Sequence, residues 1–571
     1  MLRRVLLLAA VVTVFTSTLV AVYLSFWQEP HLVKTNVAAY SNIHPADYVG
    51  PDACATCHEA QYQQWQGHSH SRMNRNASDE SVVGDFSGQK IEYGAGHVVF
   101  ERDGENFLMS LYQGESLTRQ YRVTRTVGSR IEQMYIGVQT RGPEPEGHPI
   151  YRLEGKLPFG YWMQRKIWLP DAYFDSDRLA EPTNEEQMSA SLVDVHQTIH
   201  WQQTCLYCHN TYAYQHRIFF GEGLGFRPDQ IEILGSSSLV RSWGPATPDQ
   251  LVVLGVSCES CHFGGREHAV ARRESRYLPS SPKLRVRADI KGESARIPSV
   301  SVINSICSQC HCAKISRYPN GAGTWNSREA LDLTASACSS QLKCTDCHDP
   351  HRSRHDGGIL DEPQVIETCL RCHEKYRESA PLAAHTRHAP STNVSCLDCH
   401  MPKIVQGLEE VVRSHLISSP TDAKMLKVAA PNACNLCHLD QPVTWTLAEL
   451  KSGWGREIAT DETWNREHQG DLTQPLGAVW LKHRMPVIRL IAASAYADVP
   501  QARAELPRLL PSLLDPVAVN RMFGLFAVEK VLGRRLTDDE YAPLATSERR
   551  ERQVEQLIRQ ISGAERPAAS E

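Results

Sequence analysis

The sequence predicts a mainly helical and irregular fold built around a repeated five-residue motif, with a small β-rich insertion and a C-terminal α-helical repeat domain. Three observations predict this organisation. The motif Cys-x-x-Cys-His occurs eight times along the 571 residues. Short runs typical of strands follow the first copy, and apolar residues at helical spacing follow the last copy.

In this motif two thiols can add across the vinyl groups of one haem, while the adjoining imidazole ligates its iron. Zinc knuckles combine their cysteine pairs in fours, whereas each pair here has its own histidine. We therefore expect a multihaem cytochrome c fold, mainly helix and coil around eight covalently attached haem c groups. The expected attachment residues are Cys54, Cys57, Cys205, Cys208, Cys258, Cys261, Cys307, Cys310, Cys344, Cys347, Cys369, Cys372, Cys396, Cys399, Cys434 and Cys437. The expected proximal iron ligands are His58, His209, His262, His311, His348, His373, His400 and His438.

Two of the 18 cysteines, Cys312 and Cys338, lie outside the motifs. The first interpretation is a disulfide, which an oxidising compartment permits. The alternatives are two buried inert thiols, or a reactive thiol at Cys312 beside the ligand His311.

Composition excludes a conventional hydrophobic core around the motifs. Only 41% of the residues are hydrophobic, and apolar porphyrin plates would replace many core side chains. The formal charge of −5 omits the haem propionates, so the loaded protein should be more acidic. Basic residues gather between positions 264 and 296, where a solvated face pairing with propionates is favoured over a nucleic-acid or lipid site.

The N-terminus carries an export or anchoring segment. Arg3 and Arg4 precede an uncharged, mainly apolar run over residues 5–27, which is long enough to span a bilayer. We interpret residues 1–30 as an uncleaved signal anchor with its arginines in the cytoplasm, and a cleaved signal peptide is the alternative. Either interpretation predicts that the rest of the chain lies on the periplasmic side of the membrane, where haem attachment takes place.

The domain organisation follows the motif spacing. Residues 31–85 form a first haem segment, and residues 86–180 form a β-rich insertion. Predicted strands at 97–101, 107–112, 120–124 and 133–138 are separated by turn-forming pairs. An aromatic cluster ends the insertion, either as a strand packed on the haem domain or with a tyrosine or tryptophan that lines a substrate channel: Phe159, Tyr161, Trp162, Trp168, Tyr173 and Phe174.

Residues 181–455 carry haems two to eight, and residues 456–571 form a helical domain of HEAT-like character. Two helices are predicted over 485–497 and 515–532, with Pro486 and Pro516 in their first turns. Asp515 is the expected N-cap of the second helix. Such a domain would pack on the haem region or hold a partner.

The second axial ligand decides between an electron conduit and a catalyst. Of the 25 histidines, eight lie in the motifs, so enough remain to close every haem. Bis-imidazole ligation lowers the reduction potential relative to Met/His ligation. The candidates beside motifs are His70, His196, His200, His268, His351, His385, His388 and His415, with His68, His97, His148, His216 and His355 in reserve.

Several short sequence segments resemble those of bacterial multihaem c cytochromes: residues 48–50, 65–70, 255–262 with His268, 344–351, 399–403 and 431–434. The nearest type has a C-terminal helical-repeat domain, HEAT or TPR, within the group of pentahaem nitrite reductase, octahaem hydroxylamine oxidoreductase and tetrahaem electron carriers. The resemblance covers about residues 48–454 and implies electron transfer between closely stacked haems. It implies distal ligation by His70, His268, His351, His388 and His415.

Two departures from that group are visible. No Cys-x-x-Cys-Lys marks a catalytic haem, and residues 263–265 read Phe-Gly-Gly where Gly-Pro-Gly often follows the third motif. The leading hypothesis is therefore a periplasm-facing electron carrier that receives electrons from a quinol-linked donor or a soluble cytochrome. The alternative is a reductase of nitrite, hydroxylamine or tetrathionate at one open haem, with Lys403, Arg165 or a tyrosine assisting. A sensing module docked through the helical C-terminus is a third class.

Overall fold

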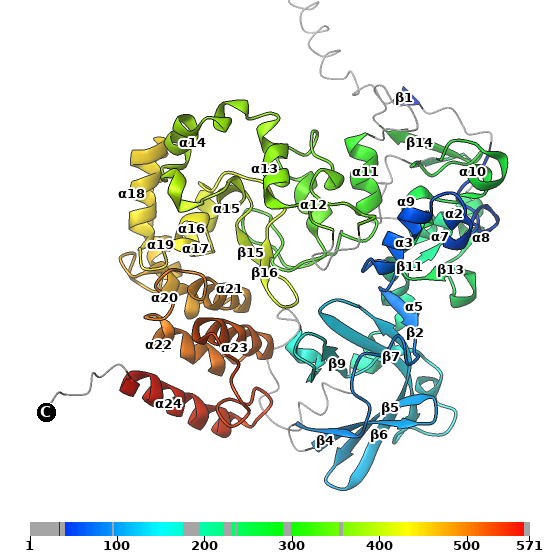
Figure 1. Ribbon diagram of the computed structural model, residues 1–571, viewed down its shortest axis with the longest axis horizontal. Helices are drawn as coiled ribbons and strands as arrows, with labels where there is room; N and C mark the ends of the chain where they lie inside the picture. Colours follow the sequence, from blue (N-terminus) through cyan, green and yellow to red (C-terminus); the bar gives the residue numbers. More distant parts are fainter. Residues whose placement is uncertain are drawn as a thin grey trace, which may run out of the picture.

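The computed structural model describes residues 33–34, 40–93, 96–174, 195–220, 231–234, 237–275, 277–288, 299–352 and 358–564. The predicted anchor over residues 1–30 lies outside these ranges. Within them, no helix combines the length and the apolar character needed to cross a bilayer. Figure 1 shows the arrangement of the parts: the motif-bearing segments spread across the top of the view, with the large β-sheet at the lower right and the C-terminal helices at the lower left.

The β-rich insertion is a nine-stranded antiparallel sheet with the main order β10-β9-β7-β6-β5-β4-β3. The four predicted strands are confirmed as the longer strands β4 (Gly96–Asp103), β5 (Asn106–Gln113), β6 (Ser116–Val127) and β7 (Glu132–Arg141). The others are β2 (Asn74–Asn76), β3 (Gln89–Tyr93), β8 (Gly155–Lys156), β9 (Phe159–Trp162) and β10 (Ile167–Pro170). Alternate residues of β4 are buried, as expected for a half-covered sheet.

The aromatic cluster at the end of the insertion is core. Trp168 stacks on Phe100 with ring centroids 3.7 Å apart, and both side chains are buried. Trp162 meets Phe526 of the C-terminal helices edge to face at 4.9 Å. The cluster is therefore packed core, as the first interpretation expects, but the partners of these rings are the sheet itself and the C-terminal helices.

The motif-bearing region consists of short helices joined by coil, as predicted. Its helices are α2 (Pro51–Ala55), α3 (Glu59–Gly67), α5 (Trp201–Thr204), α6 (Leu206–His209), α7 (Tyr214–Phe220), α8 (Ser237–Trp243), α9 (Cys258–His262), α10 (Arg266–Ala271), α11 (Val300–Cys307), α12 (Glu329–Thr334), α13 (Glu362–Leu370), α14 (Ser379–Thr386), α15 (Cys396–His400), α16 (Ala423–Lys427), α17 (Ala433–Cys437) and α18 (Val443–Trp454). Short 3-10 turns, among them η5 (Cys344–Asp346) and η6 (Glu374–Arg377), connect them. In one small sheet β14 (Leu284–Ala288) pairs with both β1 (Val33–Lys34) and β12 (Ile231–Ile233). Two others pair β11 (Asn210–Tyr212) with β13 (Leu251–Leu254), and β15 (Lys403–Gln406) with β16 (Val411–Arg413).

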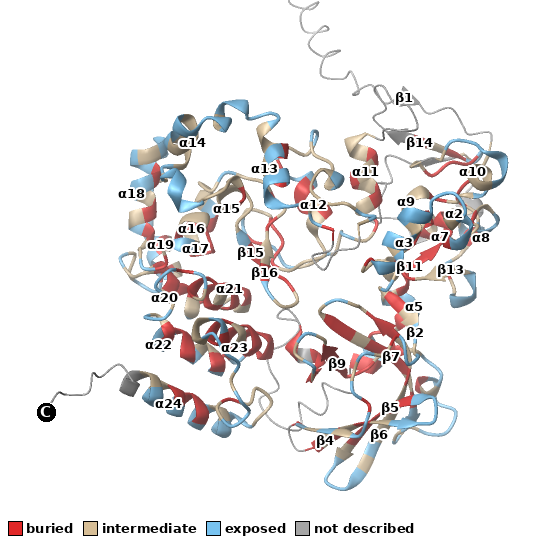
Figure 2. Ribbon diagram, viewed as in Figure 1, coloured by how far each residue is buried: buried red, intermediate tan, exposed pale blue. Residues whose placement is uncertain are grey.

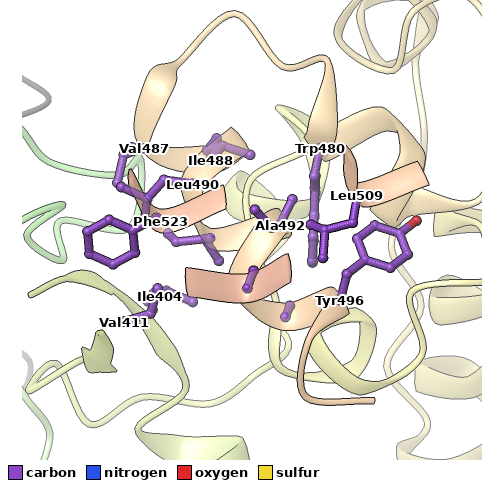
Figure 3. Close-up of a cluster of buried hydrophobic side chains, with 14 of the residues drawn as sticks. Ile404, Val411, Trp480, Val487, Ile488, Leu490, Ala492, Tyr496, Leu509 and Phe523 are labelled. Atoms are coloured by element: carbon purple, nitrogen blue, oxygen red, sulfur yellow. The ribbon is translucent and has the colours of Figure 1, made fainter. Parts of the chain in front are cut away.

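The C-terminal part is helical, with α19 (Glu462–Glu467), α20 (Leu476–Leu481), α21 (Pro486–Tyr496), α22 (Leu506–Leu509), α23 (Ala518–Leu532) and α24 (Ser547–Ala564). The inner helices α21 and α23 are buried along most of their length (Figure 2). Their core continues into β15 and β16 through Ile404 and Val411 (Figure 3). One hydrophobic cluster thus runs across position 455 without a break.

The predicted cap of α23 is wrong. The helix begins at Ala518 with Val517 as N-cap, so Pro516 precedes the first turn. The carboxylate of Asp515 accepts from the amide of the N-cap residue Val517 at 2.9 Å and also forms a bidentate ion pair with Arg489, at 2.7 and 2.9 Å. A buried guanidinium fork is a stronger partner than helix amides, and it holds Asp515 outside the helix. Pro486 does occupy the first turn of α21, as predicted.

Candidate haem-attachment sites

Each Cys-x-x-Cys-His motif closes one helical turn. The amide of His58 donates to the carbonyl of Cys54 at 2.9 Å, and His438 bonds to Cys434 in the same way at 3.0 Å. The third and seventh motifs are the helices α9 and α15 themselves. Because residues three and four apart share one helix face, the two thiols and the imidazole of a motif can meet one porphyrin.

Five motif histidines face a second imidazole from another segment of the chain. Ring centroids lie 6.1 to 6.4 Å apart, and the ring planes differ by 4° to 29°. The pairs are His58 with His268, His262 with His351, His348 with His415, His400 with His385, and His438 with His388.

This spacing fits an iron atom between the rings. A metal–nitrogen bond of about 2.0 Å, plus the distance from the nitrogen to the ring centre, puts two ligating imidazoles roughly 6.3 Å apart across a metal. Direct ring stacking would bring the centroids closer, as for His97 on Tyr112 at 4.9 Å. The paired histidines therefore fit bis-imidazole ligation of haem, which supplies one-electron chemistry at the iron.

The outer ring nitrogens have partners that set the tautomer. Nδ1 of His268 donates to the carbonyl of Arg273 at 2.7 Å, and Nδ1 of His388 donates to the carbonyl of Thr386 at 2.7 Å. This leaves Nε2 without a proton and able to bind iron. Burial lowers the pKa of His262 to about 4, so its imidazole is neutral, as a metal ligand must be.

One short turn supplies two of the facing histidines. His385 near the end of α14 faces His400, and His388 just after that helix faces His438. Between them Arg387 adopts a left-handed backbone conformation, with φ of 61° and ψ of 21°. The reversal redirects the chain, so that two histidines three residues apart serve different motifs.

Three motif histidines, His209, His311 and His373, have no described imidazole opposite them at this spacing. The predicted ligand His70 lies near His311. Burial lowers the pKa of His70 to about 3, and the charge of His311 contributes to this shift. His200 is the N-cap of α5 and bridges to Gly155 through its backbone. Ligation by His70 and His200 therefore stays a prediction.

The reserve histidines divide by position. His216 is buried; its Nδ1 contacts the carbonyl of Gly244 at 3.1 Å, and no described group bonds its Nε2, so it has the form of a ligand. His97 and His148 lie on the β-sheet and in the turn after β7. His68 is buried near His70, and His355 lies outside the described residues. His196, a candidate beside the second motif and not a reserve histidine, is buried near the sheet.

Attachment cysteines of different motifs touch one another. The contacting thiols are Cys54 with Cys258, Cys208 with Cys310, Cys307 with Cys344, and Cys369 with Cys396. The hydrogen bond from Cys208 lowers the pKa of Cys310 to about 5, and the buried Arg217 guanidinium adds to the shift. These sulfurs become thioethers when haem is attached, so the contacts matter as proximity between attachment loops.

Other contacts extend the series. The side chain of Gln309 donates to the carbonyl of Ser260 at 3.4 Å and so joins the fourth motif to the third. Thr368 donates to the carbonyl of Asp346 at 3.3 Å and joins the sixth to the fifth. The seventh motif, which is α15, packs against α17, which holds the cysteines of the eighth motif. Numbered along the chain, the motifs touch in the order 1, 3, 4, 5, 6, 7 and 8, with motif 2 beside motif 4.

Other sequence-based candidates have structural roles. Arg165 pairs with Glu529 at 2.7 Å and lies 3.8 Å over the Phe526 ring, so it joins the sheet to α23 instead of serving a reaction. The predicted disulfide is wrong, because no disulfide joins Cys312 and Cys338 in the structure. Cys312 lies near Cys310 of the fourth motif, and Cys338 lies near Cys369 of the sixth motif. The helix α12 lies between the two cysteines in the chain.

Comparisons with known proteins agree with these sites. Residues 53–91 match the family cytochrome c554 and c-prime, residues 337–378 match the doubled CXXCH motif, and residues 383–452 match cytochrome c552. Multiheme cytochrome MtrA of Shewanella baltica (strain OS185) is 25% identical over 211 residues, which cover 32% of this chain and 56% of MtrA. The chain thus matches little more than half the length of that relative.

The crystal structure of outer cell wall cytochrome OcwA aligns with 89% of this chain and 100% of its own, at 13% identity and a TM-score of 0.39. The repeated motifs and the family matches define the class of protein: this chain is a multihaem c-type cytochrome with covalently bound haem.

Proposed function

We propose that the chain is an octahaem electron carrier, in which electrons pass along mostly bis-histidine haems on the periplasmic side of a membrane. The five imidazole pairs at 6.1 to 6.4 Å carry this proposal. An iron with two imidazoles has no open position for a substrate, and its ligand set stays the same in both oxidation states. Such sites favour transfer of electrons over chemistry on a bound molecule.

The order of contacts between attachment loops supports a continuous relay. Sulfurs that anchor neighbouring porphyrins touch at four places, so the anchored ring edges are neighbours. The fourth motif meets motifs 2, 3 and 5, through Cys208, Ser260 and Cys344. The relay therefore branches at the fourth motif, with the second motif as its side arm.

An N-terminal anchor over residues 1–30, a quinol-linked or soluble cytochrome donor, and a HEAT-like role for the C-terminal helices belong to the same proposal. The apolar run over residues 5–27 supports the anchor. Burial of one face of the C-terminal helices against β15 and β16 supports a bracing role for this part.

Haem content and spin state test the carrier. Purified protein should bind eight haems by pyridine haemochromogen assay and by intact mass, and most of its ferric haem should be low-spin. A mass without eight porphyrins, or a mainly high-spin ferric spectrum, contradicts the proposal.

A second candidate is a multihaem reductase of nitrite, hydroxylamine or tetrathionate. The observation in its favour is that His209, His311 and His373 face no described imidazole at ligand spacing. Turnover of these compounds with reduced viologen, together with cyanide binding to a high-spin fraction, would favour the reductase over the carrier.

A further inference from the structure

The imidazole of His311 is hydrogen-bonded to a carboxylate, whereas Nδ1 of His351 lies 3.8 Å from the Asp349 carboxylate, beyond hydrogen-bond distance. Nδ1 of His311 donates to the Glu329 carboxylate at 3.1 Å. The rings of His268, His388 and His400 instead bond to backbone carbonyls, at 2.7 to 2.9 Å. A carboxylate carries a full negative charge, whereas a carbonyl carries only a dipole.

The Glu329 carboxylate is held in place from both sides. Its Oε1 accepts from the amide of Ser327 at 2.8 Å, and the amide of Ala330 donates to the carbonyl of His311 at 3.2 Å. Ser327 has a left-handed φ of 74°, and its carbonyl accepts from Ala313, two residues after His311, at 2.8 Å. A strained residue bonded on both sides indicates a turn that the surroundings enforce.

We propose that Glu329 lowers the reduction potential of the haem on the fourth motif by hydrogen bonding to its iron ligand, an inference that rests on the proposed octahaem function. A carboxylate on Nδ1 increases the electron donation of the imidazole through Nε2. Stronger donation and the added negative charge stabilise ferric over ferrous iron, so this haem holds its electron less tightly than haems whose ligands bond to carbonyls.

The position of this haem determines how its lower reduction potential affects the flow of electrons. The fourth motif is where the relay branches, since it contacts motifs 2, 3 and 5. The helix α12, which begins at Glu329, also fixes the next site, because Ser336 just beyond it donates to the carbonyl of the ligand His415 at 3.1 Å. A haem of low potential at the branch passes each electron on to a neighbour and does not retain it.

The test is an EPR-monitored potentiometric titration of the full-length holoprotein and its Glu329→Gln variant, which keeps the shape of the side chain and removes its charge. One haem should become easier to reduce by at least tenfold, about 59 mV for one electron. The fifth-motif haem should shift less, because its ligand His415 also lies in the field of Glu329, and the remaining haems should be unchanged. Glu329→Asp, which keeps the charge at shorter reach, should shift the same haem less.

Glu59→Gln is the matched control. Glu59 directly follows the ligand His58, and its carboxylate bonds to the Gln63 amide at 2.9 Å instead of an imidazole. Identical potentials in wild type and Glu329→Gln, or an equal shift in Glu59→Gln, overturn the role of Glu329. A wild-type haem count other than eight refutes the octahaem function instead, so the two failures are distinguishable.

Discussion

Replacing His388 with alanine should open one iron site. The His388 ring lies 6.3 Å from the His438 ring and is oriented by its bond to the Thr386 carbonyl. Without this imidazole the iron on the eighth motif has one protein ligand, and its ferric form becomes high-spin. About one-eighth of the total haem should therefore change spin state, with the haem count unchanged.

Magnetic circular dichroism and EPR spectra of the ferric protein measure this fraction. His388→Met should keep the site low-spin and raise its potential, because a thioether favours ferrous iron more than imidazole does. His97→Ala is the matched control, since that ring stacks on Tyr112 on the sheet. An unchanged spin-state distribution in His388→Ala, at full haem content, would refute the ligand assignment.

Four further predictions concern the frame around the haems. Arg387→Gly should stabilise the protein by up to about 1 kcal/mol in denaturant unfolding, because glycine adopts the left-handed conformation without strain; a loss of stability would contradict this. Arg165→Ala should lower the free energy of unfolding by about 3 kcal/mol, because it leaves the buried Glu529 carboxylate without its charged partner. The double variant Arg165→Met with Glu529→Gln should recover most of this loss. Burial raises the pKa of Glu132 from its ordinary 4.5 to about 7, so wild-type stability should fall as pH rises from about 4.5 to about 7 and then level off. Glu132→Gln should remove that pH dependence and increase the free energy of unfolding by about 2–3 kcal/mol at pH 8. Thermal unfolding at each pH measures this change. A variant whose stability varies with pH as that of the wild type does would refute the prediction. Deleting residues 456–571 should expose the core shared with β15 and β16 and give aggregated or haem-poor protein, so a soluble, fully haem-loaded truncation would show that this core is dispensable.

The local features were predictable because they depend on neighbours in sequence. The motif predicted covalent haem and the class of multihaem c-type cytochrome, both of which are confirmed. Strand alternation located β4 to β7, and helical spacing located α21 and α23 to within a few residues. The cap of α23 was missed because Asp515 has a distant partner, Arg489, that no local pattern reveals.

By itself, the sequence predicted how many haems the chain binds and through which cysteines, since one helical turn contains all the attachment groups of a motif. Only the tertiary structure decided which histidine faces which motif. His268 meets His58 across 210 positions, and His351 follows the fifth motif yet faces the third. The carboxylate of Glu329 on His311 is equally absent from any local pattern. Such pairings arise from packing of segments far apart in the chain, and hydrophobic periodicity and motif spacing carry no information about them.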